Sequence, residues 1–290
     1  MSVVVTGATG HLGRLIVEDL LDNGVHADQV VATGRRVERL ADLAERGVRV
    51  LAADLDDPAS LRAAFAGADT VMLVSGSEVG SRARQHGNAI EAARAEGVRR
   101  VVYTSATHAD TSALVLAPEH KATEELLSAS GLVVTVLRNN WYTENYLGSL
   151  EQARATGEIT AAVGQGRVAS ASRSDYAAAA GAVLRGAAHD GAVIELGGDA
   201  AWTHEELAEA LGEVLGRSVT YREVDDAERV AGLLAAGMDD GTAGFLLALD
   251  HNIRDGVLGE VTGDLSRIIG RPTTPLVEAL RQGSPLPAAH

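Results

Sequence analysis

Three glycines near the N-terminus have the spacing of a loop that binds phosphate groups. They lie in the segment Thr6-Gly7-Ala8-Thr9-Gly10-His11-Leu12-Gly13, between the apolar run 3–5 and an amphipathic stretch. This spacing permits a tight turn, a close approach of the backbone to a pyrophosphate and tight helix–strand packing. The N-terminus of the following helix adds oriented N–H groups and a partial positive charge. A turn without a ligand is the alternative. The segment predicts a dinucleotide-binding loop formed by Gly7, Ala8, Thr9, Gly10, His11, Leu12 and Gly13.

A pair of arginines after the second apolar run bears on which dinucleotide would bind. Folds specific for NAD usually place a carboxylate there, which accepts a hydrogen bond from the ribose 2′-OH. Here the segment reads Thr33-Gly34-Arg35-Arg36, with no carboxylate between Asp28 and Glu38. A guanidinium fits a 2′-phosphate, which a carboxylate would repel. We therefore predict NADPH rather than NADH, with Arg35 as the main contact. A surface arginine pair at a helix start is the alternative.

Polar and small residues follow the other apolar runs, where a doubly wound fold would complete such a site. Asp54 comes after the third run and could meet the adenine. The remaining candidates after the fourth and fifth runs are Ser75, Gly76, Ser77, Thr104 and Ser105. For each of them, an ordinary loop residue without a role in binding is an equally good interpretation.

Several other chemistries are excluded or disfavoured by the residues present. The chain has no cysteine, and its histidines lack metal-ligand spacing, so we expect no metal site. Lys121 is the only lysine and is followed by Ala122, which excludes a GK[ST] phosphate loop. Ala117 stands four residues before it, so the Tyr-x-x-x-Lys pair of many short-chain dehydrogenases is absent. The formal net charge of −15 disfavours nucleic acid or an anionic membrane as a broad-surface partner.

These candidate residues must be positioned by alternating strands and helices. Apolar runs without polar alternation indicate strands buried on both faces, as in a parallel sheet covered by helices. The expected strands are 3–5, 30–32, 48–52, 70–74, 100–104 and 133–137. Helices are expected at 11–22, 37–46, from 57 onward, 84–96 and 118–130. This pattern predicts an α/β fold of the Rossmann type, with a doubly wound parallel sheet.

The regular alternation of apolar runs and amphipathic stretches ends after Arg138, which indicates a second region. We predict an NADP-binding Rossmann domain at 1–138 and a smaller, mixed substrate-side region at 139–290. A helix at about 174–186, with the alanine run 177–180, is expected to pack back on the first domain. Strands are expected at 193–196 and 219–224, and helices at 203–215 and 272–281. A capping box is expected between Thr203 and Glu206.

Several motifs together resemble a known family. They are the glycine loop, Ser77-Glu78-Val79-Gly80, Tyr103-Thr104-Ser105, His108-Ala109-Asp110-Thr111-Ser112, Arg138 to Tyr146, Ala169 to Tyr176 and Gly270-Arg271-Pro272-Thr273-Thr274. The chain resembles NmrA-like atypical short-chain dehydrogenases over nearly its whole length, and within them the bacterial type 2 NAD(P)H:quinone oxidoreductases. One departure is Asn140, where a glycine is expected in this subgroup.

The resemblance implies hydride transfer from NADPH to a quinone. Reduced quinone oxygens are far less basic than an alkoxide, so a tuned tyrosinate contributes little and holding the rings together can carry most of the rate. The missing Tyr-Lys pair fits this substrate class. It fits equally well an NmrA-like redox sensor that binds NADP(H) with little or no catalysis, which is the alternative function.

The resemblance also directs attention to an aromatic segment and one histidine. Trp141, Tyr142 and Tyr146 are expected to line a flat-ring pocket for the quinone, or else to pin the C-terminal region onto the core. Asn139 and Asn140 are candidates to hydrogen-bond the nicotinamide amide or a quinone oxygen. His120 stands where a lysine usually sits, so it is the candidate proton donor, with a structural role as the alternative.

Membrane insertion is not expected. No apolar run approaches the ~20 residues needed to span a bilayer, and no charged-then-apolar leader precedes Val3. We expect a cytoplasmic oxidoreductase, and the sequence leaves open whether it forms a homo-oligomer.

Overall fold

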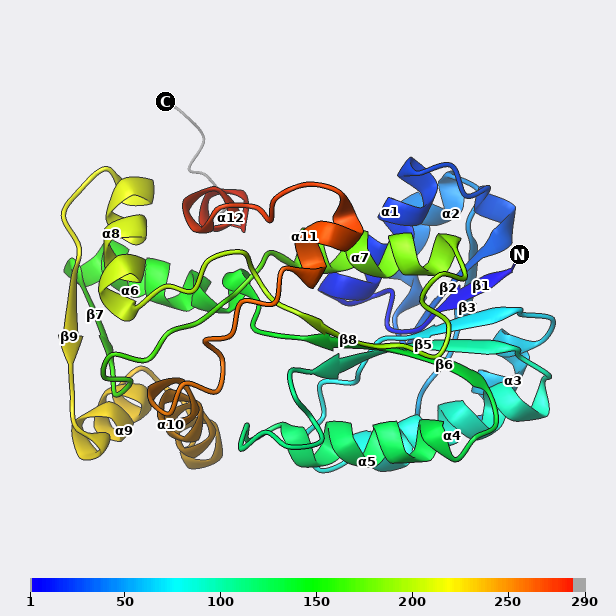
Figure 1. Cartoon of the computed structure of the whole chain (residues 1–290), viewed down its shortest axis with the longest axis horizontal. Coiled ribbons are helices and arrows are strands. Elements are labelled where there is room, and N and C mark those ends of the chain that lie inside the picture. The colour runs from blue at the N-terminus through cyan, green and yellow to red at the C-terminus, as the bar shows by residue number, and fades with distance from the viewer. Residues whose placement is uncertain (1, 284–290) are drawn as a thin grey trace.

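A seven-stranded parallel sheet forms the centre of the molecule (Figure 1). The computed structural model describes residues 2–283. The strand order is β3-β2-β1-β4-β5-β6-β8, and every neighbouring pair is parallel. The strands are β1 (Val3–Val5), β2 (Val30–Gly34), β3 (Arg49–Ala52), β4 (Thr70–Leu73), β5 (Arg100–Ala106), β6 (Val133–Asn139) and β8 (Val193–Leu196). Successive strands are added outward from β1 on one side and outward from β4 on the other, so the strand order reverses between β1 and β4. This arrangement confirms the predicted Rossmann-type fold.

Helices cover both faces of this sheet (Figure 1). One face carries α1 (His11–Asp22), α2 (Ala41–Glu45), α7 (Arg173–Arg185) and α11 (Asp264–Ile269). The other carries α3 (Pro58–Phe65), α4 (Arg82–Ala95) and α5 (Ala117–Ser128). Two short 3₁₀ helices, η1 (Ala27–Gln29) and η2 (Val37–Leu40), flank β2. The single helix predicted at 37–46 is therefore wrong in detail, since η2 and α2 divide it.

The alanine-rich helix α7 packs closely against α1. Its buried positions include Ala177, Ala179 and Ala180, whose small side chains let the two helices approach. At Gly181 even a Cβ would overlap the Asp19 carboxylate of α1. Helix α7 therefore packs on the same face of the large sheet as α1.

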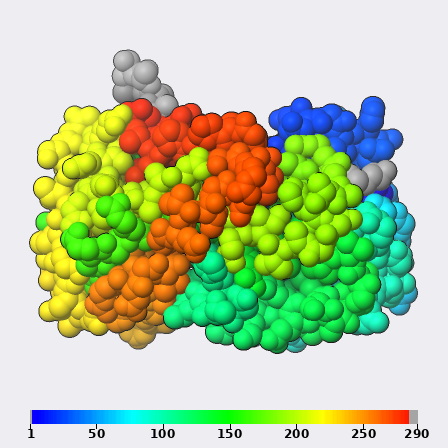
Figure 2. All heavy atoms as spheres, viewed as in Figure 1, coloured from blue at the N-terminus to red at the C-terminus, as the bar shows by residue number. Residues whose placement is uncertain are grey.

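The remaining elements form a second part at one end of the molecule (Figure 2). A two-stranded parallel sheet pairs β7 (Glu158–Ala161) with β9 (Thr220–Glu223). Around it lie η3 (Thr143–Tyr146), α6 (Leu147–Thr156), α8 (His204–Leu215), α9 (Asp226–Ala235), α10 (Asp240–Arg254) and α12 (Leu276–Gly283). The capping box predicted at the start of α8 is confirmed, because Thr203 and Glu206 each bond the other's backbone N–H. This part has its own apolar core, which includes Leu150, Leu207 and Leu258.

The chain after residue 139 contributes to both parts. It builds the second part, but it also supplies β8 at the edge of the large sheet and α7 and α11 on one face. The predicted division at residue 138 stays a prediction. Within residues 2–283, no helix combines the length and the apolar character required to cross a membrane.

Candidate active site

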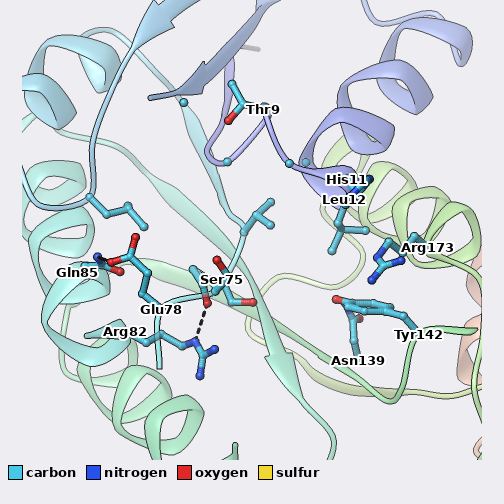
Figure 3. Close-up of a pocket in the computed structure, with 18 of the residues that line it drawn as sticks. Thr9, His11, Leu12, Ser75, Glu78, Arg82, Gln85, Asn139, Tyr142 and Arg173 are labelled. Carbon is cyan, nitrogen blue, oxygen red and sulfur yellow. Dashed lines mark hydrogen bonds between the residues drawn. The ribbon is translucent and has the colours of Figure 1, made fainter. Parts of the chain in front are cut away.

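A cavity of about 620 Å³ runs along the carboxyl ends of the large sheet's strands (Figure 3). Residues at the ends of six strands line it, from Gly7 after β1 and Gly34 of β2 to Asn139 of β6. Ligands bind at this edge of doubly wound sheets, where the strand order reverses. The cavity therefore lies where the sequence predicts a dinucleotide.

The glycine loop forms the floor of the cavity. Gly7 has φ +62°, and the Gly10 N–H donates to the Gly7 carbonyl over 2.9 Å, which closes a tight turn. A Cβ on Gly13 would lie 2.7 Å from the Gly7 carbonyl carbon, so α1 can pack this closely only through glycine. No side chain caps the N-terminus of α1. Its free N–H groups therefore face the cavity, as a pyrophosphate site requires.

One predicted member of this loop does not line the cavity. Ala8 is fully buried, and its N–H donates to the Thr33 carbonyl over 2.8 Å. It joins the loop to β2 instead of facing a ligand. The other six predicted loop residues all line the cavity: Gly7, Thr9, Gly10, His11, Leu12 and Gly13.

Three arginines surround the end of the cavity beyond β2. Arg35 and Arg36 follow the strand, and Arg39 comes from η2. Arg35 Nη1 lies 2.9 Å from Glu78 Oε1, so the guanidinium is already oriented by a carboxylate. Asp54 lines the same end, and one of its carboxylate oxygens accepts from the Asp56 N–H over 3.0 Å. This end has the cationic character that a 2′-phosphate requires.

The middle of the cavity is lined by the ends of β4 and β5. The candidates Ser75, Gly76, Ser77 and Ser105 all line it. Thr104 does not, because its hydroxyl oxygen accepts a hydrogen bond from the Ser75 N–H over 2.8 Å. Thr104 therefore supports the β4 loop from behind.

Arg82 of α4 supports the same loop. Its Nε donates to the Gly76 carbonyl over 2.8 Å (Figure 3), and its Nη1 lies 2.9 Å from Glu119 Oε2 of α5. The side chain is only 6% exposed, so this ion pair is largely withdrawn from water. Arg82 thus fixes the loop against two helices and places a buried positive charge at the cavity wall.

The far end of the cavity carries the aromatic segment. Trp141 and Tyr142 line it, and Arg173 lies over the Tyr142 ring at 4.8 Å from its centroid. Asn139 Nδ2 donates to the Tyr142 hydroxyl over 3.3 Å, and Figure 3 shows the three side chains together. A flat ring held by a cation and an amide forms a rigid wall on which a planar ligand can stack.

Two predicted residues of the aromatic segment have other partners. Tyr146 does not line the cavity, since its ring packs at 4.8 Å from that of Trp202 in the second part. Tyr146 belongs to the apolar core of the second part, so its position does not support the expected contact with a quinone. Asn140 lines the cavity, but its Nδ2 donates to the Leu258 carbonyl over 3.1 Å. That amide is therefore engaged with the segment after α10.

His120 of α5 lines the cavity near the end of β5. The side chain is buried, and its Nδ1 lies 2.8 Å from the Tyr103 hydroxyl. Burial, with smaller contributions from Arg82 and His86, lowers the pKa of His120 to about 3. The imidazole is therefore neutral near pH 7, which makes it a hydrogen-bond donor or acceptor rather than a cationic acid.

Comparison with known proteins settles the family. A model of NAD(P)H-binding proteins matches residues 7–186, which include the glycine loop and most of the cavity wall. The chain belongs to the NAD(P)H-binding family.

Relatives within the NAD(P)H-binding family cover nearly the whole chain. Quinone oxidoreductase 2 of Escherichia coli (strain K12) is 46% identical over 278 residues, covering 96% of this chain and 97% of that protein. The crystal structure of Escherichia coli NADPH-dependent quinone oxidoreductase QOR2 with NADPH matches with a TM-score of 0.92 and 45% identity, covering 97% and 99% of the two chains. Citrobacter sp. triphenylmethane reductase with NADP(H) matches with a TM-score of 0.92 and 36% identity, covering 98% of this chain and all of that one. The predicted resemblance to quinone oxidoreductases is confirmed.

Several cavity residues of this NAD(P)H-binding protein were not predicted from the sequence. Among them are Arg39, Glu78, Arg82, Gln85 and Arg173. A cluster of arginines after β2 is visible in the sequence, so Arg39 could have been found from its charge. Nothing local indicates Arg82 or Arg173, since each reaches the cavity from a helix whose position depends on the tertiary fold.

Proposed function

We propose that the chain reduces quinones by transfer of hydride from NADPH. The observation that carries this proposal is the 46% identity to quinone oxidoreductase 2 over 96% of the chain. The geometry supports it, because one continuous cavity joins the glycine loop and the arginine cluster to a wall formed by Tyr142 and Trp141.

The residues present fit the cofactor. The uncapped N-terminus of α1 and the Gly7–Gly13 turn would hold the pyrophosphate, and Arg35 would bind the 2′-phosphate, with Arg36 and Arg39 nearby. Asp54 would meet the adenosine half, and Asn139 the nicotinamide half; both line the cavity. When bound, NADPH supplies a hydride; the quinone takes up that hydride and one proton from solvent, giving NADP⁺ and the hydroquinone.

The protein's own part is to orient two flat rings and to exclude water between them. Tyr142 is fixed by Arg173 on its face and Asn139 at its hydroxyl, so the acceptor wall needs no rearrangement. Holding the two reactants together in this way can lower the activation barrier by up to about 7–11 kcal/mol. A quinone is a strong enough acceptor that no tyrosinate is required.

The test is the loss of NADPH absorbance when purified protein is mixed with a simple benzoquinone. We expect turnover of about 1 per second or faster. A panel that includes a triphenylmethane dye and an azo dye would define the range of planar acceptors. Tight binding of NADPH without turnover of any acceptor would instead support the redox-sensor alternative.

A further inference from the structure

The two nitrogens of His120 have different surroundings. Nδ1 lies 2.8 Å from the hydroxyl of Tyr103, a residue with no exposed surface. Nε2 has no hydrogen-bond partner among residues 2–283. It is nevertheless in contact with the cavity, unlike Nδ1 of His204, which is unpartnered and fully buried. Because His120 lines the cavity, Nε2 is the nitrogen that a ligand there can reach.

A chain of hydrogen bonds behind the cavity fixes the neighbouring protons. The Gly76 N–H donates to His86 Nε2 over 3.1 Å, so that nitrogen carries no proton and the proton is on Nδ1. His86 Nδ1 then donates to the Thr123 hydroxyl oxygen over 3.0 Å. Thr123 in turn donates its own proton to the Glu119 carbonyl over 2.9 Å. The backbone therefore sets the direction of every bond in this chain.

Tyr103 completes the arrangement, with its ring packed edge-on against His86 at 5.4 Å. Its hydroxyl proton needs an acceptor, because a buried donor without one is costly. Among residues 2–283 the hydrogen-bond partner of this hydroxyl is Nδ1 of His120, at 2.8 Å, so Nδ1 is the acceptor. A Tyr103 hydroxyl that donates to Nδ1 requires the His120 proton to be on Nε2, facing the cavity.

We propose that Tyr103 is a positioning residue that holds His120 in its Nε2–H tautomer, so that this N–H donates a hydrogen bond to the acceptor oxygen that gains negative charge. The inference rests on the proposed function and names the donor within that site. A preorganised N–H at this point favours the reduced product over the oxidised substrate. The neutral imidazole keeps its proton, and the proton that completes the hydroquinone comes from solvent.

The surroundings support a donor that does not ionise. Burial, with smaller contributions from Arg82 and His86, lowers the pKa of His120 to about 3. Burial also raises the pKa of Tyr103, so the tyrosine does not pass its proton on. Tyr103 and His120 therefore polarise each other without forming a buried ion pair.

The tautomer can be measured directly on the full chain without cofactor. We expect the imidazole ¹⁵N NMR signals of His120 to show a protonated Nε2 and an unprotonated Nδ1, assigned by their loss in His120→Leu. In Tyr103→Phe these signals should move toward a mixture of tautomers. Tyr221→Phe is the matched control, since Tyr221 lies in β9 and donates to the Ala161 carbonyl away from the cavity.

Kinetics with benzoquinone test the donor role. We expect kcat to fall about 10-fold in His120→Leu and about 3-fold in Tyr103→Phe, the range of a single hydrogen bond, with KM for NADPH unchanged. In the double variant Tyr103→Phe should cost nothing further, because it acts only through His120. A protonated Nδ1 in the wild type with normal turnover would overturn this inference alone. Absence of turnover in a wild type that shows the Nε2–H tautomer would overturn the quinone reductase function, and the donor role with it.

Discussion

Glu78 holds the guanidinium of Arg35 in an ion pair, with 2.9 Å between Oε1 and Nη1. The other carboxylate oxygen accepts from Gln85 Nε2 over 3.0 Å. Glu78 thus connects the loop after β4 to the end of β2 across the mouth of the cavity. The carboxylate occupies a position on Arg35 that a 2′-phosphate would also seek, so the two anions compete for one guanidinium.

Glu78→Gln should strengthen NADPH binding several-fold, by about 1 kcal/mol, because the ion pair is partly exposed and removal of the carboxylate frees Arg35. NADH binding should change little, since it has no 2′-phosphate. Calorimetric Kd values for both nucleotides would check this. Glu91→Gln is the matched control, because Glu91 pairs with Arg94 on α4 away from the cavity. An equal gain for both nucleotides would contradict the competition.

Arg35→Asp should weaken NADPH binding about 100-fold and NADH binding far less. The change removes a charge-assisted contact to the 2′-phosphate and adds a repelling carboxylate. The ratio of the two Kd values is the measurement. Arg94→Asp on α4 should leave that ratio unchanged, and an equal loss for both nucleotides would show that Arg35 does not read the 2′-phosphate.

Gly13→Ala should lower the affinity for both nucleotides at least 10-fold. The added Cβ would lie 2.7 Å from the Gly7 carbonyl carbon and closer still to its oxygen, which would push the loop from its present turn. Gly148→Ala in α6 is a suitable control, because a Cβ there meets nothing within 4 Å. We expect that control to bind normally and to be slightly more stable. Normal binding by Gly13→Ala would mean that the loop is not packed as described.

Stability should fall as the pH drops below about 6.5. Burial lowers the pKa of His86 and His120 to about 3, and that of His204 to about 4. In the unfolded chain these groups bind protons near pH 6.5 while the folded protein excludes them, so stability is complete above that pH and is lost on acidification. Each histidine contributes up to about 1.4 kcal/mol per pH unit in this window.

Urea unfolding at a series of pH values between 7 and 5 measures this slope. His86→Gln should make it shallower, whereas His26→Gln, which removes an exposed histidine, should not change it. A slope identical in the wild type and in His86→Gln would contradict the burial of a neutral His86.

The sequence was most informative where structure is dictated locally. Strands β1, β2, β4 and β5 are buried along their whole length and are therefore rich in apolar residues, whereas β3 at the sheet edge is partly exposed. The glycine loop follows β1 directly. Helix α6 was missed because its sequence includes glycine, serine and threonine and buries only Leu150 and Ala153. Its amphipathic pattern is correspondingly weak.

Long-range placement was not accessible from the sequence. Val193–Leu196 was predicted as a strand, but its pairing with β6 depends on contacts distant in the chain. Tyr142 and Tyr146 are four residues apart and chemically identical, and only the intervening η3 directs one to the cavity and the other to Trp202. The role of Glu78 depends on its ion pair with Arg35, which follows a different strand.

The path of the chain after β6 has a consequence for dissecting the protein. The polypeptide builds part of the second region and then returns to the large sheet as α7 and β8. A fragment ending at residue 138 would therefore expose the edge of β6 that pairs with β8, and the apolar face of α1 that packs against α7. Such a fragment should aggregate when expressed, despite containing every glycine of the nucleotide loop. A circular permutant that keeps all these segments would be the better tool for separating cofactor binding from acceptor binding.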